Sequence, residues 1–174
     1  MKKVFLFMMI MTAYPLYAAT ITYKAIDLAD TTVGEDLWQY KYTVKDHVFP
    51  AGNGFSIFFD SSIYGSLQNP APFVNPNWDI LVLQPDDQLL ADGIYDALAL
   101  VNNPSLTDIF TLTFVWRGLG TPSFQRFEIY DTSFNIIENG NTTVSIVPVP
   151  PAFVLFGSSL LMLMGRKMKS RFYR

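Results

Sequence analysis

The middle of this 174-residue chain alternates apolar and polar side chains with a period of two, which is the spacing of a strand that buries one face. The clearest run places Trp38, Tyr40, Tyr42 and Val44 on one face and Gln39, Lys41, Thr43 and Lys45 on the other. Two further runs have the same alternation, with Phe55, Ile57 and Phe59 in one and Phe110, Leu112, Phe114 and Trp116 in the other. A one-sided strand must bury its apolar face against a second layer. The sequence therefore predicts an all-β fold, an antiparallel β-sandwich or jelly roll.

Other segments of strand composition are separated by turns rich in Gly, Pro, Asn and Asp. They are residues 21–25, 78–83, 94–101, 124–131, 134–138 and 142–147. Residues 88–91 are interpreted as part of a turn, because Gly93 interrupts any helical continuation. Asn139-Gly140 is a strong hairpin signal, so residues 134–138 and 142–147 are expected to pair with each other.

The first 19 residues have the order of parts that is typical of a secretory signal peptide. Two lysines precede an apolar run at residues 4–11, and Pro15 precedes the small residues Ala18 and Ala19. The run is shorter than the ~20 residues of a transmembrane helix, which disfavours the alternatives of an uncleaved anchor or a buried helix. We expect cleavage after Ala18, with cleavage after Ala19 as the alternative.

The C-terminal end has the composition of a membrane anchor. Residues 147–165 carry no charge, and five cations follow within the last nine residues. A helix of this length reaches roughly 28 Å at ~1.5 Å per residue, close to the hydrocarbon thickness of a bilayer. We expect a transmembrane helix that begins near Pro151, with the cations in the cytoplasm and the body outside. The alternatives are an amphipathic surface helix and a last core helix.

The chain is thus divided into a signal peptide (1–19), a β-sandwich domain (20–146) and a tail (147–174). The tail combines a proline motif, an apolar segment and a basic end, formed by Val147, Pro148, Val149, Pro150, Leu155, Phe156, Gly157, Ser158, Arg166 and Lys167. This combination resembles the PEP-CTERM sorting signal, in its variant with Val-Pro-Leu-Pro and Leu-Phe-Gly-Ser-Gly-Leu. Two positions depart from that variant: Val149 stands where the family has Glu or Leu, and Ser159 stands where Gly is usual.

The resemblance implies processing by exosortase, a membrane-embedded, cysteine transpeptidase-like enzyme of Gram-negative bacteria that make exopolysaccharide. It also implies transient anchoring in the inner membrane, removal of the tail near the proline motif, and delivery to the cell surface or the extracellular matrix. The expected partners are therefore exosortase, the membrane and exopolysaccharide.

The charge of the body limits its other partners. Residues 20–146 contain five bases and all fifteen acids of the chain, a net charge of −10. Such a body repels phosphate backbones, which disfavours nucleic-acid binding. The chain has no cysteine, which excludes a thiolate nucleophile and a cysteine-ligated metal.

No catalytic constellation is evident, and we predict a protein that is not an enzyme and needs no cofactor. His47 is the only histidine and is interpreted as a solvated loop residue rather than a general base. Acids at the turns are interpreted as solvated, with a calcium site as the alternative; they are Asp60, Asp86, Asp87 and Asp92.

Aromatic residues permit two interpretations. Trp38, Trp78 and Trp116, with Tyr40 and Tyr42, form either a sugar-stacking platform or part of the core. The core is favoured for Trp38 and Trp116, and Trp78 is left open because it follows a loop. The leading hypothesis is an exported surface or matrix protein associated with exopolysaccharide. The alternatives are a carbohydrate-binding module and, less favoured, a glycan hydrolase.

Overall fold

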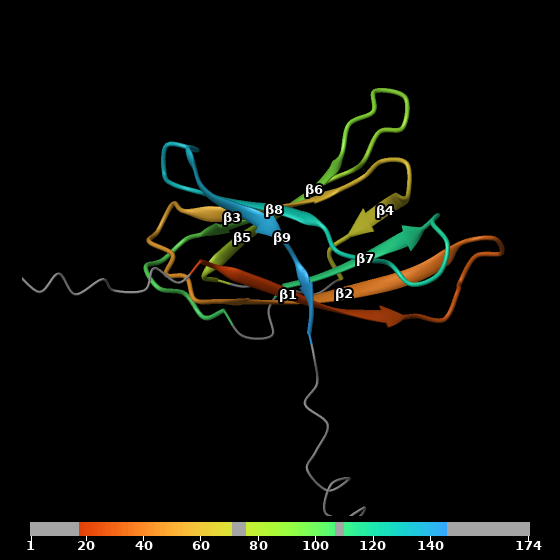
Figure 1. Ribbon diagram of the computed structural model, residues 1–174, viewed down its shortest axis with the longest axis horizontal. Helices are drawn as coiled ribbons and strands as arrows, with labels where there is room; N and C mark the ends of the chain where they lie inside the picture. The colour runs from red at the N-terminus through yellow and green to blue at the C-terminus, as the bar shows by residue number, and fades with distance from the viewer. Residues whose placement is uncertain (1–17, 71–75, 107–109, 146–174) are drawn as a thin grey trace, which may run out of the picture. The chain divides into compact units, whose positions relative to one another are not determined.

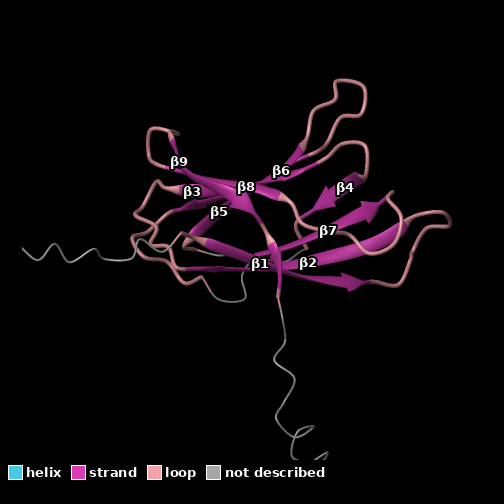
Figure 2. Cartoon of the chain, in the orientation of Figure 1, coloured by secondary structure: helices cyan, strands magenta, loops and turns pink. Residues whose placement is uncertain are grey.

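Ten β-strands occur in the part of the chain that the computed structural model describes, residues 18–70, 76–106 and 110–145 (Figure 2). They are β1 (Thr20–Asp27), β2 (Asp36–Lys45), β3 (Gly54–Phe59), β4 (Tyr64–Gln68), β5 (Trp78–Leu83), β6 (Gly93–Ala99), β7 (Phe110–Trp116), β8 (Arg126–Tyr130), β9 (Ile136–Asn141) and β10 (Thr143–Val144). None of the described residues is helical, so the all-β prediction is confirmed.

All of the described strands belong to one compact unit, which ends at Val144. Within the described residues no helix is long and apolar enough to cross a bilayer. The predicted apolar segments at both ends of the chain lie outside those residues.

The strands form two five-stranded sheets that pack as a sandwich (Figure 1). Sheet A has the order β10-β1-β2-β7-β4, and sheet B has the order β5-β6-β3-β8-β9. Every neighbouring pair is antiparallel except β1 and β10, which are parallel. The predicted sandwich of largely antiparallel sheets is therefore confirmed for the described residues between Thr20 and Val144.

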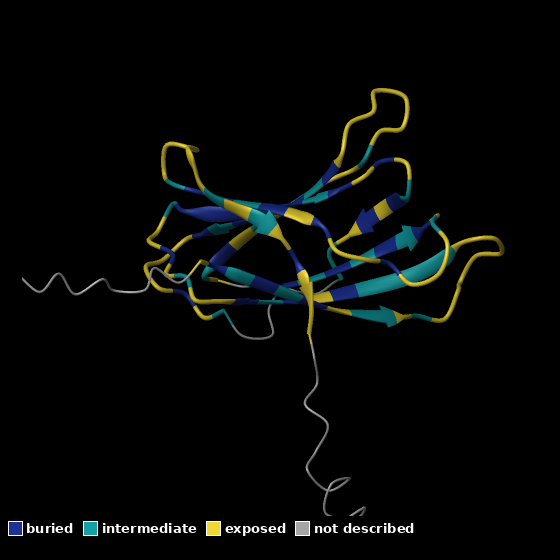
Figure 3. Ribbon diagram, in the orientation of Figure 1, coloured by how far each residue is buried: buried dark blue, intermediate teal, exposed yellow. Residues whose placement is uncertain are grey.

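The predicted alternation decides which side chains fill the space between the sheets. Buried and more exposed residues alternate along β6 and β7, whereas the loops that join the strands are mostly exposed (Figure 3). The largest fully buried side chains are Tyr40, Tyr42, Tyr95, Phe49, Phe55, Phe59, Phe110, Phe114, Ile21, Ile57, Leu67 and Leu112. Phe55 of sheet B meets Phe110 of sheet A edge to face, with ring centroids 4.9 Å apart. Such pairs contribute about 0.5–1.5 kcal/mol each beyond their buried area, which suits a sandwich without disulfides.

A buried polar cluster of Tyr40, Tyr42, Tyr64, Gln125 and Thr142 lies within this aromatic core. The Nε2 atom of Gln125 is 2.8 Å from the hydroxyl of Tyr40 and 3.0 Å from that of Tyr64. Its Oε1 atom accepts hydrogen bonds from the hydroxyls of Tyr42 and Thr142. Gln125 precedes β8 of sheet B and Thr142 precedes β10 of sheet A, so these contacts join segments that lead into different sheets.

The tyrosines of the buried polar cluster are held in their neutral form. Burial raises the pKa of Tyr40, Tyr42 and Tyr64 above the ordinary value of 10.0. Because the hydroxyls stay protonated, each remains able to donate as well as accept a hydrogen bond.

The predicted hairpin at Asn139-Gly140 is wrong. Both residues lie inside β9, where they pair with Glu128 and Phe127 of β8. A Cβ atom at Gly140 would lie 3.0 Å from the ring of Phe127, so this glycine serves close packing rather than a turn. After β9 the chain crosses to sheet A, and the expected partner segment forms β10 beside β1 instead.

The turn that joins β8 to β9 lies earlier, at residues 131–135. The Oδ1 atom of Asp131 accepts hydrogen bonds from the backbone N–H groups of Ser133 and Asn135, at 2.8 and 3.0 Å. Phe134, which was expected in a strand, has a φ of 60° within this turn. The local bonds of the aspartate side chain therefore outweigh the strand preference of the aromatic residue.

The short strand β4 was not predicted. Its register with β7 shifts between Gly65 and Gln68, and Ser66 in this bulge has a φ of 50°. The bulge lets Tyr64 and Leu67, which are three residues apart, both lie in the core, and this spacing breaks the two-residue period.

Candidate binding face

The residues of the sorting motif, Val147 to Lys167, lie outside the described residues. At the other end, Ala18 and Ala19 are described: Ala18 is exposed, whereas Ala19 belongs to the core. Among the described residues, the core thus begins at Ala19.

The proposed sugar-stacking platform is not present on the surface. Tyr40, Tyr42, Trp78 and Trp116 are all buried in the core. The indole N–H groups of Trp78 and Trp116 donate to the backbone oxygens of Ser105 and Gly120, at 3.0 and 2.8 Å. The core interpretation of Trp116 is confirmed, and the open question for Trp78 is settled in favour of the core. Trp38 is partly buried, and its N–H donates to Asp36 at 2.7 Å.

Two of the turn carboxylates, Asp60 and Asp86, are used within their own loops, and a third forms an ion pair. Asp86 accepts hydrogen bonds from the backbone N–H groups of Gln88 and Leu89, and Asp60 accepts from the N–H and hydroxyl of Ser62. Asp87 is paired with Arg117 at 2.7 Å. Across the described ranges no group of three or more His, Cys, Asp or Glu side chains clusters in a way that could hold a metal ion.

His47 is less exposed than the interpretation as a solvated residue requires. Its side chain is 16% exposed and packs on Phe49, with ring centroids 4.5 Å apart. Its Nδ1 atom lies 3.6 Å from the Oε2 atom of Glu138, and its Nε2 atom is buried with no hydrogen-bond partner among the described residues. Burial lowers the pKa of His47 from the ordinary value of 6.5, and Glu138 partly opposes that shift.

We expect the sandwich to lose stability as the pH falls below about 6.5. The unfolded chain then takes up a proton on His47 before the folded chain does, because the folded pKa is the lower one. The contribution is fully present above 6.5 and is lost progressively as the pH falls through the folded pKa. The thermal midpoint of a His47→Gln variant should vary less with pH in this window than that of the natural chain. Equal pH profiles for the two proteins would contradict the assignment.

The outer face of sheet A carries a regular array of polar side chains, which we call the lysine–threonine face. It consists of Thr22 and Lys24 of β1, Gln39, Lys41, Thr43 and Lys45 of β2, and Thr111 and Thr113 of β7. These residues alternate with core residues such as Tyr23, Tyr40 and Leu112, so they point away from the core.

The strand register arranges this face in rows. Thr22 lies opposite Thr43; Lys24 lies opposite Lys41, which lies opposite Thr111 on its other side. Neighbours within a row are about 4.8 Å apart across the strands, and successive rows are about 6.8 Å apart along them. The face therefore offers charged and hydroxyl groups in a two-dimensional grid.

The charges on this face are unbalanced. Lys24, Lys41 and Lys45 are all exposed and have no carboxylate partner among the described residues, whereas Arg117 and Arg126 are each ion-paired. No outward-facing position of β1, β2 or β7 holds an acid. All three lysines of an otherwise acidic body thus share one face, and two of them lie directly opposite each other.

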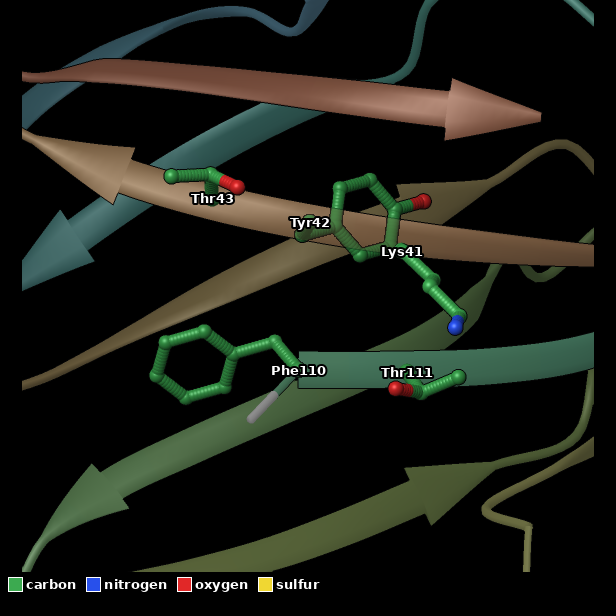
Figure 4. Close-up of a pocket in the computed structure, with 5 residues that line it drawn as sticks. All are labelled: Lys41, Tyr42, Thr43, Phe110 and Thr111. Atoms are coloured by element: carbon green, nitrogen blue, oxygen red, sulfur yellow. The ribbon is translucent and has the colours of Figure 1, made fainter. Parts of the chain in front are cut away.

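A hollow of about 140 Å³ lies at the boundary of β2 and β7, where outward-facing and core residues meet (Figure 4). Its lining comes from Lys41, Tyr42, Thr43, Phe110 and Thr111. Ligand pockets usually measure roughly 300–1,000 Å³, so this hollow suits one substituent of a ligand rather than a whole small molecule.

The sequence already grouped Gln39, Lys41, Thr43 and Lys45 on the polar side of one strand. It did not show that Lys24, Thr111 and Thr113 lie beside them, because the order and register of strands depend on contacts distant in sequence. The available signal was that Thr or Lys recurs at alternate positions in each of three separate strands.

Comparisons with known proteins add little to this description. No family model matches the sequence, and no curated protein matches it. Among solved structures, it is similar to a chain of the "Crystal structure of Coh-OlpA-Doc918 complex: A novel type I Cohesin-Dockerin complex from Clostridium thermocellum ATTC 27405". That match has a TM-score of 0.38 and 14% identity, and it covers 74% of this chain and 100% of the other. A similarity of this size carries no inference about function.

Proposed function

We propose that this chain is an exported, non-enzymatic β-sandwich protein that binds anionic exopolysaccharide through its lysine–threonine face. Its C-terminal signal delivers it by way of exosortase to the cell surface or extracellular matrix. The observation that carries the binding proposal is that Lys24, Lys41 and Lys45 share one face of a body with a net charge of −10 and have no carboxylate partner in the part of the chain that the structure describes.

The chemistry of the face fits a polymer of acidic sugars. Ammonium groups pair with sugar carboxylates, and the hydroxyls of Thr22, Thr43 and Thr111 exchange hydrogen bonds with sugar hydroxyls. Each exposed contact is weak, about 0.2–1 kcal/mol for an ion pair, so binding depends on several contacts along the chain. The acidic remainder of the body then repels the polymer and favours this single face.

The pairing of Lys24 with Lys41 supports a binding role. Like charges placed directly opposite each other across two strands destabilise a sheet. The pair of Lys24 and Lys41 therefore does not stabilise the fold, but a bound polyanion would neutralise the two positive charges.

The non-enzymatic part of the proposal is supported by the surroundings of His47. One ring nitrogen faces Glu138 and the other is buried, so the only histidine of the chain does not present a free base to solvent. The stacking version of the carbohydrate-binding hypothesis is not retained for the buried tryptophans.

We expect the mature chain, purified in mild detergent, to bind immobilised polygalacturonate and not the neutral polymer dextran. The triple substitution of Lys24, Lys41 and Lys45 with Gln should raise the Kd by about three- to 150-fold, because three lost ion pairs of about 0.2–1 kcal/mol each sum to about 0.6–3 kcal/mol. Binding should also weaken as salt rises from 50 to about 500 mM. Biolayer interferometry measures each of these changes.

A matched control is available in Arg126, whose guanidinium is paired with Glu128 and stacks on Phe58 of sheet B. Lys41→Gln should weaken binding roughly threefold, whereas Arg126→Gln, with the same change in charge, should leave it nearly unchanged. Equal effects of the two variants, or tighter binding to anionic lipid vesicles than to polygalacturonate, would contradict the proposal.

A further inference from the structure

The first residue of the folded body lies beside a carboxylate of β9. The backbone N–H of Ala19 donates a hydrogen bond to the Oε1 atom of Glu138 at 2.5 Å. The other oxygen of the same carboxylate lies 3.6 Å from the Nδ1 atom of His47. The Glu138 side chain is only 22% exposed, so it is partly shielded from water. A shielded acid is thus directed at the nitrogen atom with which the folded body begins.

Burial marks the same boundary. Ala19 is 8% exposed and packs in the core, whereas Ala18 is exposed. Cleavage of the peptide bond between Ala18 and Ala19 therefore removes no buried side chain of the described residues, whereas cleavage after Ala19 removes a buried methyl group.

We infer that Glu138 is a binding site for the α-ammonium group of the mature chain, which is created by cleavage between Ala18 and Ala19. This inference rests on the proposed export. Hydrolysis by a leader peptidase adds one water across the amide bond: Ala18 leaves as a carboxylate, and Ala19 keeps the nitrogen as an amine. An α-amino group has a pKa of about 7.7–8.0, so the amine takes up a proton at neutral pH. The new charge arises on the atom that already contacts Glu138.

Cleavage one residue later does not produce this contact. It would remove both the donor nitrogen and the buried methyl group of Ala19. The new ammonium would then belong to Thr20, which lies directly opposite Lys45 in the ladder between β1 and β2. The new ammonium group would then lie near the cation of Lys45 instead of near the carboxylate of Glu138.

Removal of the leader therefore strengthens the folded body. A hydrogen bond between two charged groups is roughly twice as strong as one with a neutral donor. The contact also joins the start of sheet A to β9 at the edge of sheet B, so the added strength acts between the two sheets. Cleavage of the leader thus also stabilises the folded body, through the stronger contact at Glu138.

The cleavage site is tested by intact mass and N-terminal sequencing of the exported protein. We expect Ala19 as the first residue. A start at Thr20, or at any other residue of the body, would overturn the assignment. A chain that keeps Met1 and the whole leader would overturn the proposed export and the maturation step with it.

The ion pair is tested separately, on mature chains made with Ala19 as a free or an acetylated N-terminus. Acetylation keeps the N–H group and removes the charge, and the exposed position of Ala18 shows that an acyl group has room there. In the natural sequence acetylation should lower the thermal midpoint by about 3 °C. In the Glu138→Gln variant it should change the midpoint by less than about 1 °C. Equal shifts in both backgrounds would overturn the ion pair, whatever the leader does in the cell.

Discussion

Replacing Gln125 with alanine is expected to lower the thermal midpoint of the body by about 10 °C, which corresponds to about 3 kcal/mol of unfolding free energy. The amide of Gln125 is the common partner of Tyr40, Tyr42, Tyr64 and Thr142 in the buried polar cluster. Its removal leaves several buried hydroxyls short of partners, and each such group costs about 1–3 kcal/mol. Thermal unfolding followed by near-ultraviolet circular dichroism measures the change.

The matched control is Gln88→Ala, which removes the same side chain from an exposed turn and should shift the midpoint by no more than about 2 °C. A double-mutant cycle with Tyr40→Phe tests the cluster directly. The two substitutions should be less than additive, because each removes part of the same network. Full additivity, or a Gln125→Ala effect as small as that of Gln88→Ala, would show that this amide does not join the two sheets.

Deleting residues 148–174 is expected to move the protein almost completely from the membrane fraction to the soluble exported fraction. The deletion removes the apolar segment and the five terminal cations, which together provide the predicted anchor and its orientation. The folded body does not depend on this segment for the strands described above, which end at Val144. Fractionation with immunoblotting of both proteins gives the result.

A second variant separates anchoring from sorting. Replacing Pro148 and Pro150 with alanine keeps the apolar segment and the cations but removes the proline motif. This variant should stay in the membrane fraction with its tail uncleaved. Continued membrane association of the truncated chain would contradict the anchor, and normal processing of the proline variant would contradict the sorting signal.

Much of the fold was predictable because side-chain periodicity depends on local sequence. The alternation in β2, β3 and β7 gave both the strands and their buried faces, since a strand with one apolar face has one favourable orientation. Residues 88–91 form a turn closed by a bridge between Asp86 and Ala91, as expected.

The errors arose where contacts distant in sequence override a local signal. Asn139-Gly140 has the composition of a tight turn, but Gly140 pairs with Phe127 of the neighbouring strand and lies close to its ring. Strand β4 was missed because its bulge hides the period of two. Neither the partner ring nor the register shift can be read from the residues concerned.

The candidate site was only half predictable for the same reason. Periodicity identified Lys41 and Thr43 as outward-facing, but only the sheet order places Lys24 and Thr111 next to them. The aromatic residues show the opposite case. Trp78 follows a loop in the sequence, yet its ring packs on Phe49 and Phe110 in the core.

The proposed binding of an anionic polysaccharide to the outer face of sheet A can be located by NMR, with a titration of the isotope-labelled mature chain with short polygalacturonate chains that follows the backbone amide signals. We expect the largest shifts on β1, β2 and β7, around Lys24, Lys41 and Thr111. Shifts concentrated on the strands of sheet B, or no shifts at concentrations that saturate the immobilised polymer, would contradict this proposal.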